Sequence, residues 1–399
     1  MKRVYIVTAI TCLALFAAFL GLFKYLNLSR GKEHVKVGFI YDNDESTPYT
    51  YNFSLAKDAL EKEYGDRVEI LTSSNVIDEE IEAPLRNLAD QQCDIIFFNG
   101  YSEKVVELAP EYPGIQFCQT SYRDMTGLVG QLPSNYHTFK GEAYQGRYVS
   151  GIAAGYKIRQ LIQDGVITED QAKVGFVAAF STSEVISGYT AFLLGVRSVV
   201  PTAVMEVSYT NTWSSYPQEK RSAQKMIEDG CVVISQHTDT IGPAIACEEA
   251  FVNRPVYFVG YNQTMSEVAP AASLVTSRIC WEPYVLQVVD AVMKEQEIES
   301  LVSAKIVGTD AFAGFEKGWV ELTDLNEQAV APGTQEALSE VVERFRDGED
   351  DFVFRGSYVG VDPENPSDTL NLQNGYIENE TTSYPTFHYL LSDIITVVE

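Results

Sequence analysis

Short apolar runs alternate with amphipathic stretches along most of the chain from residue 34 onward. The first run, Val35–Tyr41, is rich in β-branched and aromatic residues and predicts a strand. The stretch 53–64 then repeats its apolar side chains at the spacing of a helix. The same alternation predicts further strands at 67–71, 94–98 and 115–118, and helices at 78–89 and 102–109.

A second series of the same kind begins at Lys173. Its predicted strands are 174–178, 203–209, 232–234 and 256–259, and its predicted helices are 184–196, 218–227 and 240–250. Residues 139–162 form a long helical candidate between the two series. Two successive β-α-β series indicate an α/β protein with two doubly wound parallel sheets, each covered by helices on both faces.

The pattern weakens beyond residue 271, where helices are predicted only at 286–298 and 330–346 and a strand at 394–398. We therefore predict two lobes joined by a hinge. Lobe one is expected to cover 34–160, with a return segment around 271–305. Lobe two is expected to cover 165–270, with C-terminal segments around 306–399.

The N-terminal residues 1–30 carry a separate signal. Val4–Phe23 is a run of 20 residues without a charge, preceded by Lys2 and Arg3 and followed by Lys24. As a helix, such a run spans ~30 Å, the thickness of a bilayer core. The cationic flank favours an N-terminus in the cytoplasm and a body outside it. A cleaved signal, with an apolar region of ~7–15 residues, fits the length less well, so a single transmembrane anchor at the cell membrane is expected.

Composition narrows the range of partners. The chain has 29 Lys and Arg against 56 Asp and Glu, a formal charge of -27, which argues against nucleic-acid binding. Its six cysteines show neither a Cys-x-x-Cys pair nor the spacing of a zinc site, and several lie in apolar runs, so we interpret them as small buried side chains. A disulfide between Cys93 and Cys118 remains open at this stage.

The sequence offers little catalytic chemistry. It lacks the dinucleotide-binding fingerprint, the phosphate-binding loop and the nucleophile elbow of hydrolases. The acidic loop Asp42–Ser46 resembles the opening of a calcium loop, but Thr47 and Phe53 replace the required Gly and Glu. His237 and Asp239 have no nucleophile at a recognisable spacing. We expect no metal, no cofactor and no enzymatic activity.

Polar and aromatic residues recur where the predicted strands end. The carboxyl ends of parallel strands form the edge at which open α/β sheets bind ligands. A flat ligand held there would stack on aromatic rings at about 1–3 kcal/mol per contact, and amides and carboxylates would read its edge. The strand-end residues predicted to bind a ligand are Tyr49, Asn99, Trp213, His237, Thr238, Asp239 and Asn262.

Several segments resemble the basic membrane protein family of ABC transporter substrate-binding proteins, over roughly residue 34 to the C-terminus. The segments that carry the resemblance are Tyr49-Thr50-Tyr51, Tyr144-Gln145-Gly146-Arg147-Tyr148, Gly175-Phe176-Val177-Ala178-Ala179-Phe180, Leu194-Gly195-Val196-Arg197-Ser198, Asn211-Thr212-Trp213, Gln236-His237-Thr238-Asp239, Gly260-Tyr261 and Trp281-Glu282-Pro283-Tyr284. The resemblance implies a periplasmic-binding-protein type I fold with a hinged cleft. It also implies delivery of a purine base or nucleoside to an ABC permease and ATPase.

The resemblance adds Trp281 to the predicted ligand-binding residues, although packing under the hinge is an alternative for this side chain. Asp239 has an alternative role as a helix cap, and His237 as a structural histidine. The chain departs from the family's pattern at three positions, where Tyr49 replaces a Trp, and Ser46 and Asn262 replace Asp. These departures bear on which purine is bound. A ligand sensor built on the same fold is the alternative function.

Overall fold

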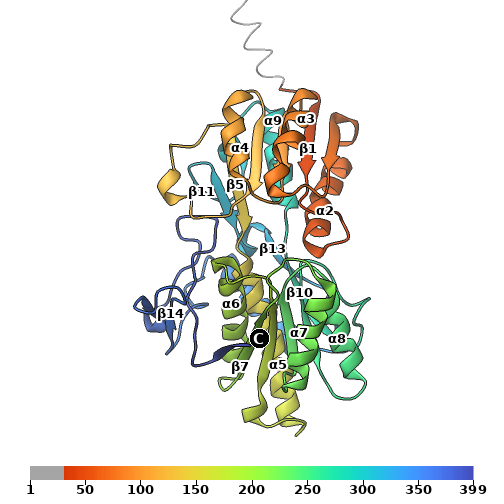
Figure 1. Ribbon diagram of the computed structural model, residues 1–399, viewed down its shortest axis with the longest axis vertical. Coiled ribbons are helices and arrows are strands. Elements are labelled where there is room, and N and C mark those ends of the chain that lie inside the picture. The colour runs from red at the N-terminus through yellow and green to blue at the C-terminus, as the bar shows by residue number, and fades with distance from the viewer. Residues whose placement is uncertain (1–30, 399) are drawn as a thin grey trace, which may run out of the picture.

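Two seven-stranded sheets organise the chain, one in each of two α/β lobes (Figure 1). The structure is a computed structural model and describes residues 31–398. The predicted anchor, Val4–Phe23, lies outside the described residues. Within residues 31–398, no helix combines the length and the apolar character that a membrane crossing requires.

The lobe-one sheet has the strand order β11-β12-β5-β4-β3-β1-β2 and is parallel except for the β11–β12 pair. Its strands are β1 (Val35–Ile40), β2 (Val68–Ser73), β3 (Ile95–Phe98), β4 (Gln116–Thr120), β5 (Tyr136–Gly141), β11 (Lys305–Val307) and β12 (Asp310–Ala313). The helices of this lobe are α2 (Pro48–Tyr64), α3 (Glu82–Asp90), α4 (Glu103–Leu108), α9 (Glu282–Met293) and α10 (Ile298–Leu301).

The lobe-two sheet has the order β13-β10-β9-β8-β6-β7-β16 and is parallel except for the β10–β13 pair. Its strands are β6 (Lys173–Ala178), β7 (Val204–Tyr209), β8 (Val233–His237), β9 (Tyr257–Tyr261), β10 (Ser273–Ile279), β13 (Val320–Thr323) and β16 (Ile395–Val398). The helices of this lobe are α5 (Ala143–Gln163), α6 (Ser183–Val199), α7 (Tyr216–Glu228), α8 (Gly242–Phe251) and α11 (Thr334–Arg346).

Helices bury both faces of each sheet, which explains the continuous apolar strands. In β1, Val37 and Phe39 pack toward α2 and α9, whereas Ile40 belongs to the separate cluster beneath α3 and α4. Side chains of a strand alternate between the two faces, so a strand covered on both faces must be apolar at nearly every position. The prediction of two parallel-sheet lobes is confirmed, with one antiparallel strand added at one edge of each sheet.

The structure divides the chain between the lobes differently from the prediction. Helix α5 packs against α6 in the lobe-two core, although 139–162 was assigned mainly to lobe one. Strand β10 pairs with β9 in lobe two, although it was assigned to the lobe-one return segment. Strands β11 and β12 join the lobe-one sheet, and only β11 begins inside the predicted return segment 271–305. The chain therefore passes between the lobes at 141–143, 279–282 and 313–320.

The α5–α6 crossing explains why α5 belongs to lobe two. A side chain on Gly151 would meet the carbonyl oxygen of Phe192 at 2.1 Å, and one on Gly195 would meet that of Tyr148 at 2.1 Å. Both glycines are therefore required for the two helix backbones to approach this closely. Hydrophobic periodicity alone does not predict which neighbour such a helix selects.

The C-terminal segment, residues 347–398, lies along one side of the molecule, with β16 at its end (Figure 1). It forms the small antiparallel sheet of β14 (Val359–Val361) and β15 (Thr369–Asn371), and then adds β16 beside β7. Phe354, Phe387 and Leu391 from this segment are buried in the lobe-two core. The segment is therefore an integral part of the fold.

All five cysteines between residues 31 and 398 are free and buried. Cys93 and Cys118 form no disulfide with each other. Burial raises the pKa of the Cys93 thiol to about 11 and raises the pKa values of Cys118, Cys231, Cys247 and Cys280 further. Their burial agrees with the interpretation of cysteine as a small apolar side chain.

Candidate functional site

A cavity of about 380 Å³ lies between the lobes and is lined by residues from both. Its lobe-one side is built from the ends of β1, β3, β4 and β5. Its lobe-two side is built from the start of α6 and from the residues that follow β7, β8 and β9. Its volume is toward the small end of ligand pockets, which is appropriate for a small molecule.

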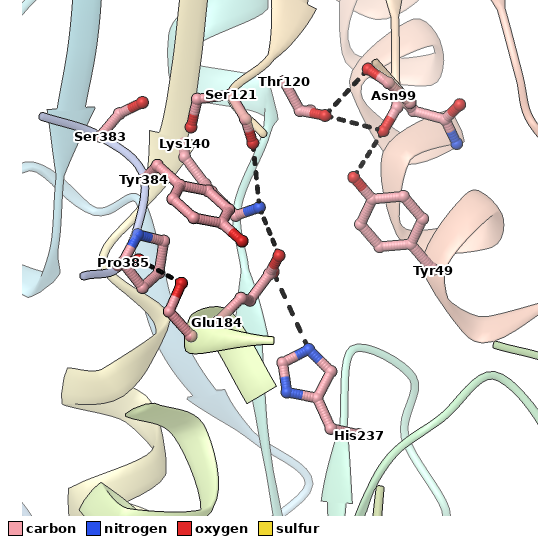
Figure 2. Close-up of polar contacts among 12 residues, drawn as sticks. Tyr49, Asn99, Thr120, Ser121, Lys140, Glu184, His237, Ser383, Tyr384 and Pro385 are labelled. Atoms are coloured by element: carbon pink, nitrogen blue, oxygen red, sulfur yellow. Dashed lines mark hydrogen bonds and ion pairs between the residues drawn. The ribbon is translucent and has the colours of Figure 1, made fainter. Parts of the chain in front are cut away.

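Asn99 organises the lobe-one wall. Its side-chain amide donates to Asp42 Oδ1 at 2.8 Å, and the backbone N–H of Asp42 donates to Asn99 Oδ1 at 2.8 Å. The Tyr49 hydroxyl donates to the Asn99 carbonyl at 2.7 Å, as Figure 2 shows. Asn99 and Tyr49 therefore line the cavity with their main polar groups already paired, and Asn99 fixes Asp42 at the end of β1.

Lys140, Glu184 and His237 form a polar chain across the cavity (Figure 2). Lys140 Nζ, at the end of β5 in lobe one, donates to Glu184 Oε2 at 2.8 Å, on the first turn of α6 in lobe two. Glu184 Oε1 lies 3.9 Å from His237 Nε2. A carboxylate in the first turn of a helix is stabilised by the helix dipole. The ion pair therefore connects the two lobes at the cavity.

Burial, together with the charges of Arg147 and Lys140, lowers the pKa of His237 well below its ordinary value. His237 is therefore neutral at physiological pH, and its Nδ1 has no hydrogen-bond partner among residues 31–398. Beside it, the Tyr261 ring stacks on the guanidinium of Arg147, with the ring centroid 3.4 Å from Arg147 Cζ. Arg147 is fully buried.

Trp213 and Asp239 form the lobe-two wall. Their main chains are joined by a hydrogen bond of 2.8 Å from the Asp239 N–H to the Trp213 carbonyl. The Trp213 ring is supported at its side by Phe180, at a centroid distance of 5.3 Å, and remains 38% exposed. The Asp239 carboxylate has no hydrogen bond to any residue between 31 and 398. An unpaired carboxylate beside an open aromatic ring is suited to a flat ligand with N–H groups on its edge.

Burial, and then repulsion by Asp42, Glu219 and Glu184, raises the pKa of Asp239 well above its ordinary value. Asp78, on the lobe-one side, has its pKa raised to about 6 by burial and by Asp42 and Glu79. The carboxylates that line the cavity outnumber its one lysine, Lys140. The cavity therefore favours neutral or cationic ligands over anions.

Six of the eight predicted ligand-binding residues line this one cavity: Tyr49, Asn99, Trp213, His237, Asp239 and Asn262. Thr238 is buried outside the lining. Trp281 also lies outside it, because its ring packs in the lobe-one core against Phe53 at 5.2 Å and Phe139 at 5.6 Å. This position is a correction to the prediction and corresponds to the packing role that the sequence left open for Trp281.

The lining also contains residues that were not predicted to bind a ligand. Tyr101 and Tyr122 stack on each other at 4.7 Å on the lobe-one side, and Lys140 and Tyr384 lie near Glu184. Tyr101 lies three residues after the end of β3, in the strand-end segment Asn99-Gly100-Tyr101, from which only Asn99 was predicted to bind the ligand. Lys140 lies within the stretch 139–162 that was predicted as one long helix, so its position at the end of strand β5 was not predicted. Nothing local in the sequence indicates that Tyr384 reaches the cavity.

The cavity lining contains no serine or cysteine paired with His237, and its carboxylates show no metal-ligand arrangement. Among residues 31–398, the one group of side chains with metal-ligand spacing is Asp362, Asp368 and His388, in the C-terminal segment and outside the cavity.

Comparison with known proteins agrees with this geometry. Residues 35–345 match the family described as ABC transporter substrate-binding protein PnrA-like. The chain is 27% identical over 278 residues to a purine-binding protein of Brucella abortus, covering 68% of this chain and 73% of that protein. It is also 27% identical over 255 residues to a protein of Haloferax volcanii named as an ABC transporter glucose-binding protein, covering 63% of this chain and 59% of that protein.

Among solved structures, a solute-binding protein of an ABC transporter system from Conexibacter woesei superposes with a TM-score of 0.60. The match covers 80% of this chain and 99% of that chain at 18% identity. The two proteins share the two-lobed periplasmic-binding-protein fold.

Proposed function

The chain belongs to the PnrA-like family of ABC transporter substrate-binding proteins, and from this premise we propose that it captures a purine base or nucleoside in the cleft between its lobes. Proteins of this family bind solutes outside the cytoplasm for an ABC permease and do not act as enzymes on them. The identity of the solute is the part that we infer from the site.

The observation that carries the proposal is the pairing of Trp213 and Asp239 at one wall of the cavity. The open Trp213 ring offers a stacking surface, and the unpaired Asp239 carboxylate offers an acceptor for ring or exocyclic N–H groups. The neutral His237 ring lies beside this wall, with its centroid 6.2 Å from that of Trp213. A purine presents both a flat face and an N–H edge, so it satisfies these groups together.

A hexose is the second candidate, because sugars also pack on aromatic rings and hydrogen-bond to carboxylates, and one relative is named as a glucose-binding protein. Membership of the family does not by itself distinguish a purine ligand from a sugar ligand. The purine is favoured because the purine-named relative matches over a larger share of both chains.

Isothermal titration with adenine, guanine, hypoxanthine, their nucleosides, adenosine monophosphate and glucose tests the proposal. We expect a base or nucleoside to bind at least tenfold more tightly than both glucose and the nucleotide. The nucleotide should bind weakly because its phosphate would enter an acidic cavity. Binding of glucose with no purine binding would reject the proposal in favour of a sugar ligand, and binding of neither class would also reject it.

We also infer that Val4–Phe23 anchors the protein in the membrane, since its 20 uncharged residues match the thickness of a bilayer core. In the cells that express it, the full-length protein should sediment with membranes and resist extraction by high salt and carbonate. A variant that begins at Gly31 should be recovered in the soluble fraction. Release of the full-length protein by carbonate would contradict the anchor.

A further inference from the structure

One wall of the cavity comes from a part of the chain beyond the family match. The match ends at residue 345, within α11, yet Tyr384 lines the cavity from the C-terminal segment. In Figure 2 the Tyr384 ring lies beside Lys140 and Glu184, with Ser383 and Pro385 on either side of it in sequence. We call residues 378–387 the strap.

The strap is fixed to lobe two through a buried glutamate. Glu378 Oε2 accepts from the Ser187 hydroxyl of α6 at 2.6 Å, and Glu378 Oε1 accepts from the Thr386 N–H at 2.6 Å. The Phe387 N–H donates to the same carboxylate at 3.1 Å, and the Phe387 ring is fully buried in the lobe-two core. The Ser183 hydroxyl, at the start of α6, donates to the Pro385 carbonyl at 2.7 Å.

The strap is also fixed to lobe one. The Ser383 N–H donates to Asp310 Oδ2 of β12 at 2.7 Å, and Thr138 of β5 donates to the other oxygen of Asp310 at 2.7 Å. The Met125 N–H donates to the Thr382 hydroxyl at 3.2 Å. Lys305 Nζ of β11 donates to the Asn379 carbonyl at 3.1 Å. Glu378, Asn379, Thr382 and Ser383 are all buried, so these contacts form a packed joint.

Tyr384 is held between these two attachments. Lys140 Nζ lies 5.7 Å from the centre of the Tyr384 ring, so the ring borders the ion pair of Lys140 with Glu184. The ring is half-buried, and its open part faces the cavity. Its position is fixed by the neighbouring residues Ser383 and Pro385, one attached to each lobe.

We propose that the strap closes one side of the cleft and that Tyr384 is a ligand-binding residue whose ring packs against an uncharged, flat part of the ligand. The proposal rests on the proposed function only for the identity of the ligand. Because the strap is attached to both lobes, the ring is in place before the ligand arrives, which reduces the ordering cost of binding.

The test uses the full chain and three variants, titrated with the tightest-binding compound of the purine and glucose panel. Tyr384→Ala should weaken binding at least fivefold, whereas Tyr384→Phe, which keeps the ring, should stay within twofold of the wild type. Tyr389→Ala is the matched control, because Tyr389 lies in the same C-terminal segment outside the cavity lining. Binding by Tyr384→Ala within twofold of the wild type would overturn the role of Tyr384.

Hydrogen–deuterium exchange of the ligand-free protein tests the strap separately. A peptide covering residues 380–388 should exchange at least tenfold more slowly than the exposed loop 362–368, because the Ser383, Thr386 and Phe387 amides are bonded to buried carboxylates. Asp310→Asn should accelerate exchange at Ser383. Exchange as fast as that of the loop would overturn the strap. This measurement needs no ligand, so failure of the purine assignment and failure of the strap are distinguishable.

Discussion

Replacing Asp239 by asparagine is expected to weaken purine binding by about 10- to 150-fold and, at the same time, to stabilise the ligand-free protein. A hydrogen bond to a charged group contributes about 1.5–3 kcal/mol, which corresponds to that range of affinity. The Asp239 carboxylate is an acceptor at the lobe-two wall to which no described residue donates. Its replacement should therefore lower mainly the affinity for the ligand.

The gain in stability follows from the pKa of Asp239. Its pKa is raised in the folded protein, so the folded state binds more protons than the unfolded state between the two pKa values. The free energy of unfolding therefore falls as pH rises through the folded pKa, and asparagine removes this loss. Thermal unfolding at pH 5 and pH 8, without ligand, should show a higher midpoint for the variant at pH 8 and a smaller difference at pH 5.

Asp170→Asn is the matched control for this variant, because Asp170 is exposed and distant in the fold from the cavity lining. It should change neither the affinity nor the unfolding midpoint. An Asp239→Asn protein that binds the ligand as tightly as the wild type would show that Asp239 only caps its loop.

Trp281→Ala is expected to have the largest effect on stability, about 3–5 kcal/mol, because it removes a fully buried ring from the lobe-one core. Phe53, Phe139 and Tyr49 all lie against this ring. Denaturant unfolding, monitored by the loss of signal from lobe one, should show a much lower midpoint denaturant concentration for the variant than for the wild type. Trp281→Phe should recover most of the loss.

Trp213→Ala is expected to have the opposite effects, with little change in stability and a large loss of affinity for the ligand. Its ring is 38% exposed, so the change in unfolding free energy should stay below about 1 kcal/mol. Its affinity for a purine should fall by about 5- to 150-fold, the equivalent of one base–aromatic contact. If Trp281→Ala weakened binding more than it lowered stability, Trp281 would belong to the site after all.

Most of the fold could be predicted from the sequence because the central strands of both sheets are buried on both faces. Strands such as β3, Ile95–Phe98, are uniformly apolar and end at turns, so they are distinguished from the amphipathic helices around them. β5 was missed because its last three residues, 139–141, fall within the stretch 139–162 that was predicted as one helix. β10 was missed because its serines and threonines, including Ser273, Thr276 and Ser277, are buried polar residues that carry no apolar signal.

Of the candidate site, only the residues at strand ends could be predicted from the sequence. His237 ends β8, and Trp213, Asp239 and Asn262 follow β7, β8 and β9 of the same parallel sheet, so the rule for parallel sheets placed them on one edge. Thr238 is adjacent in sequence to two of them but points away from the cavity lining. Tyr384 reaches the cavity through contacts between residues separated by about 70 to 200 positions, such as Asp310 with Ser383 and Ser187 with Glu378. No local pattern encodes such contacts.

The buried thiols have a practical consequence for measuring how the lobes move. Nucleophilic attack on a maleimide needs a thiolate, and each cysteine between residues 31 and 398 is both enclosed and poorly ionised. A fluorescent dye added to a folded, soluble version that begins at Gly31 should therefore react selectively with a cysteine introduced at the rim of the cleft. The version that begins at Gly31 can thus be converted into a reagentless optical sensor for its solute without replacing any of its five cysteines.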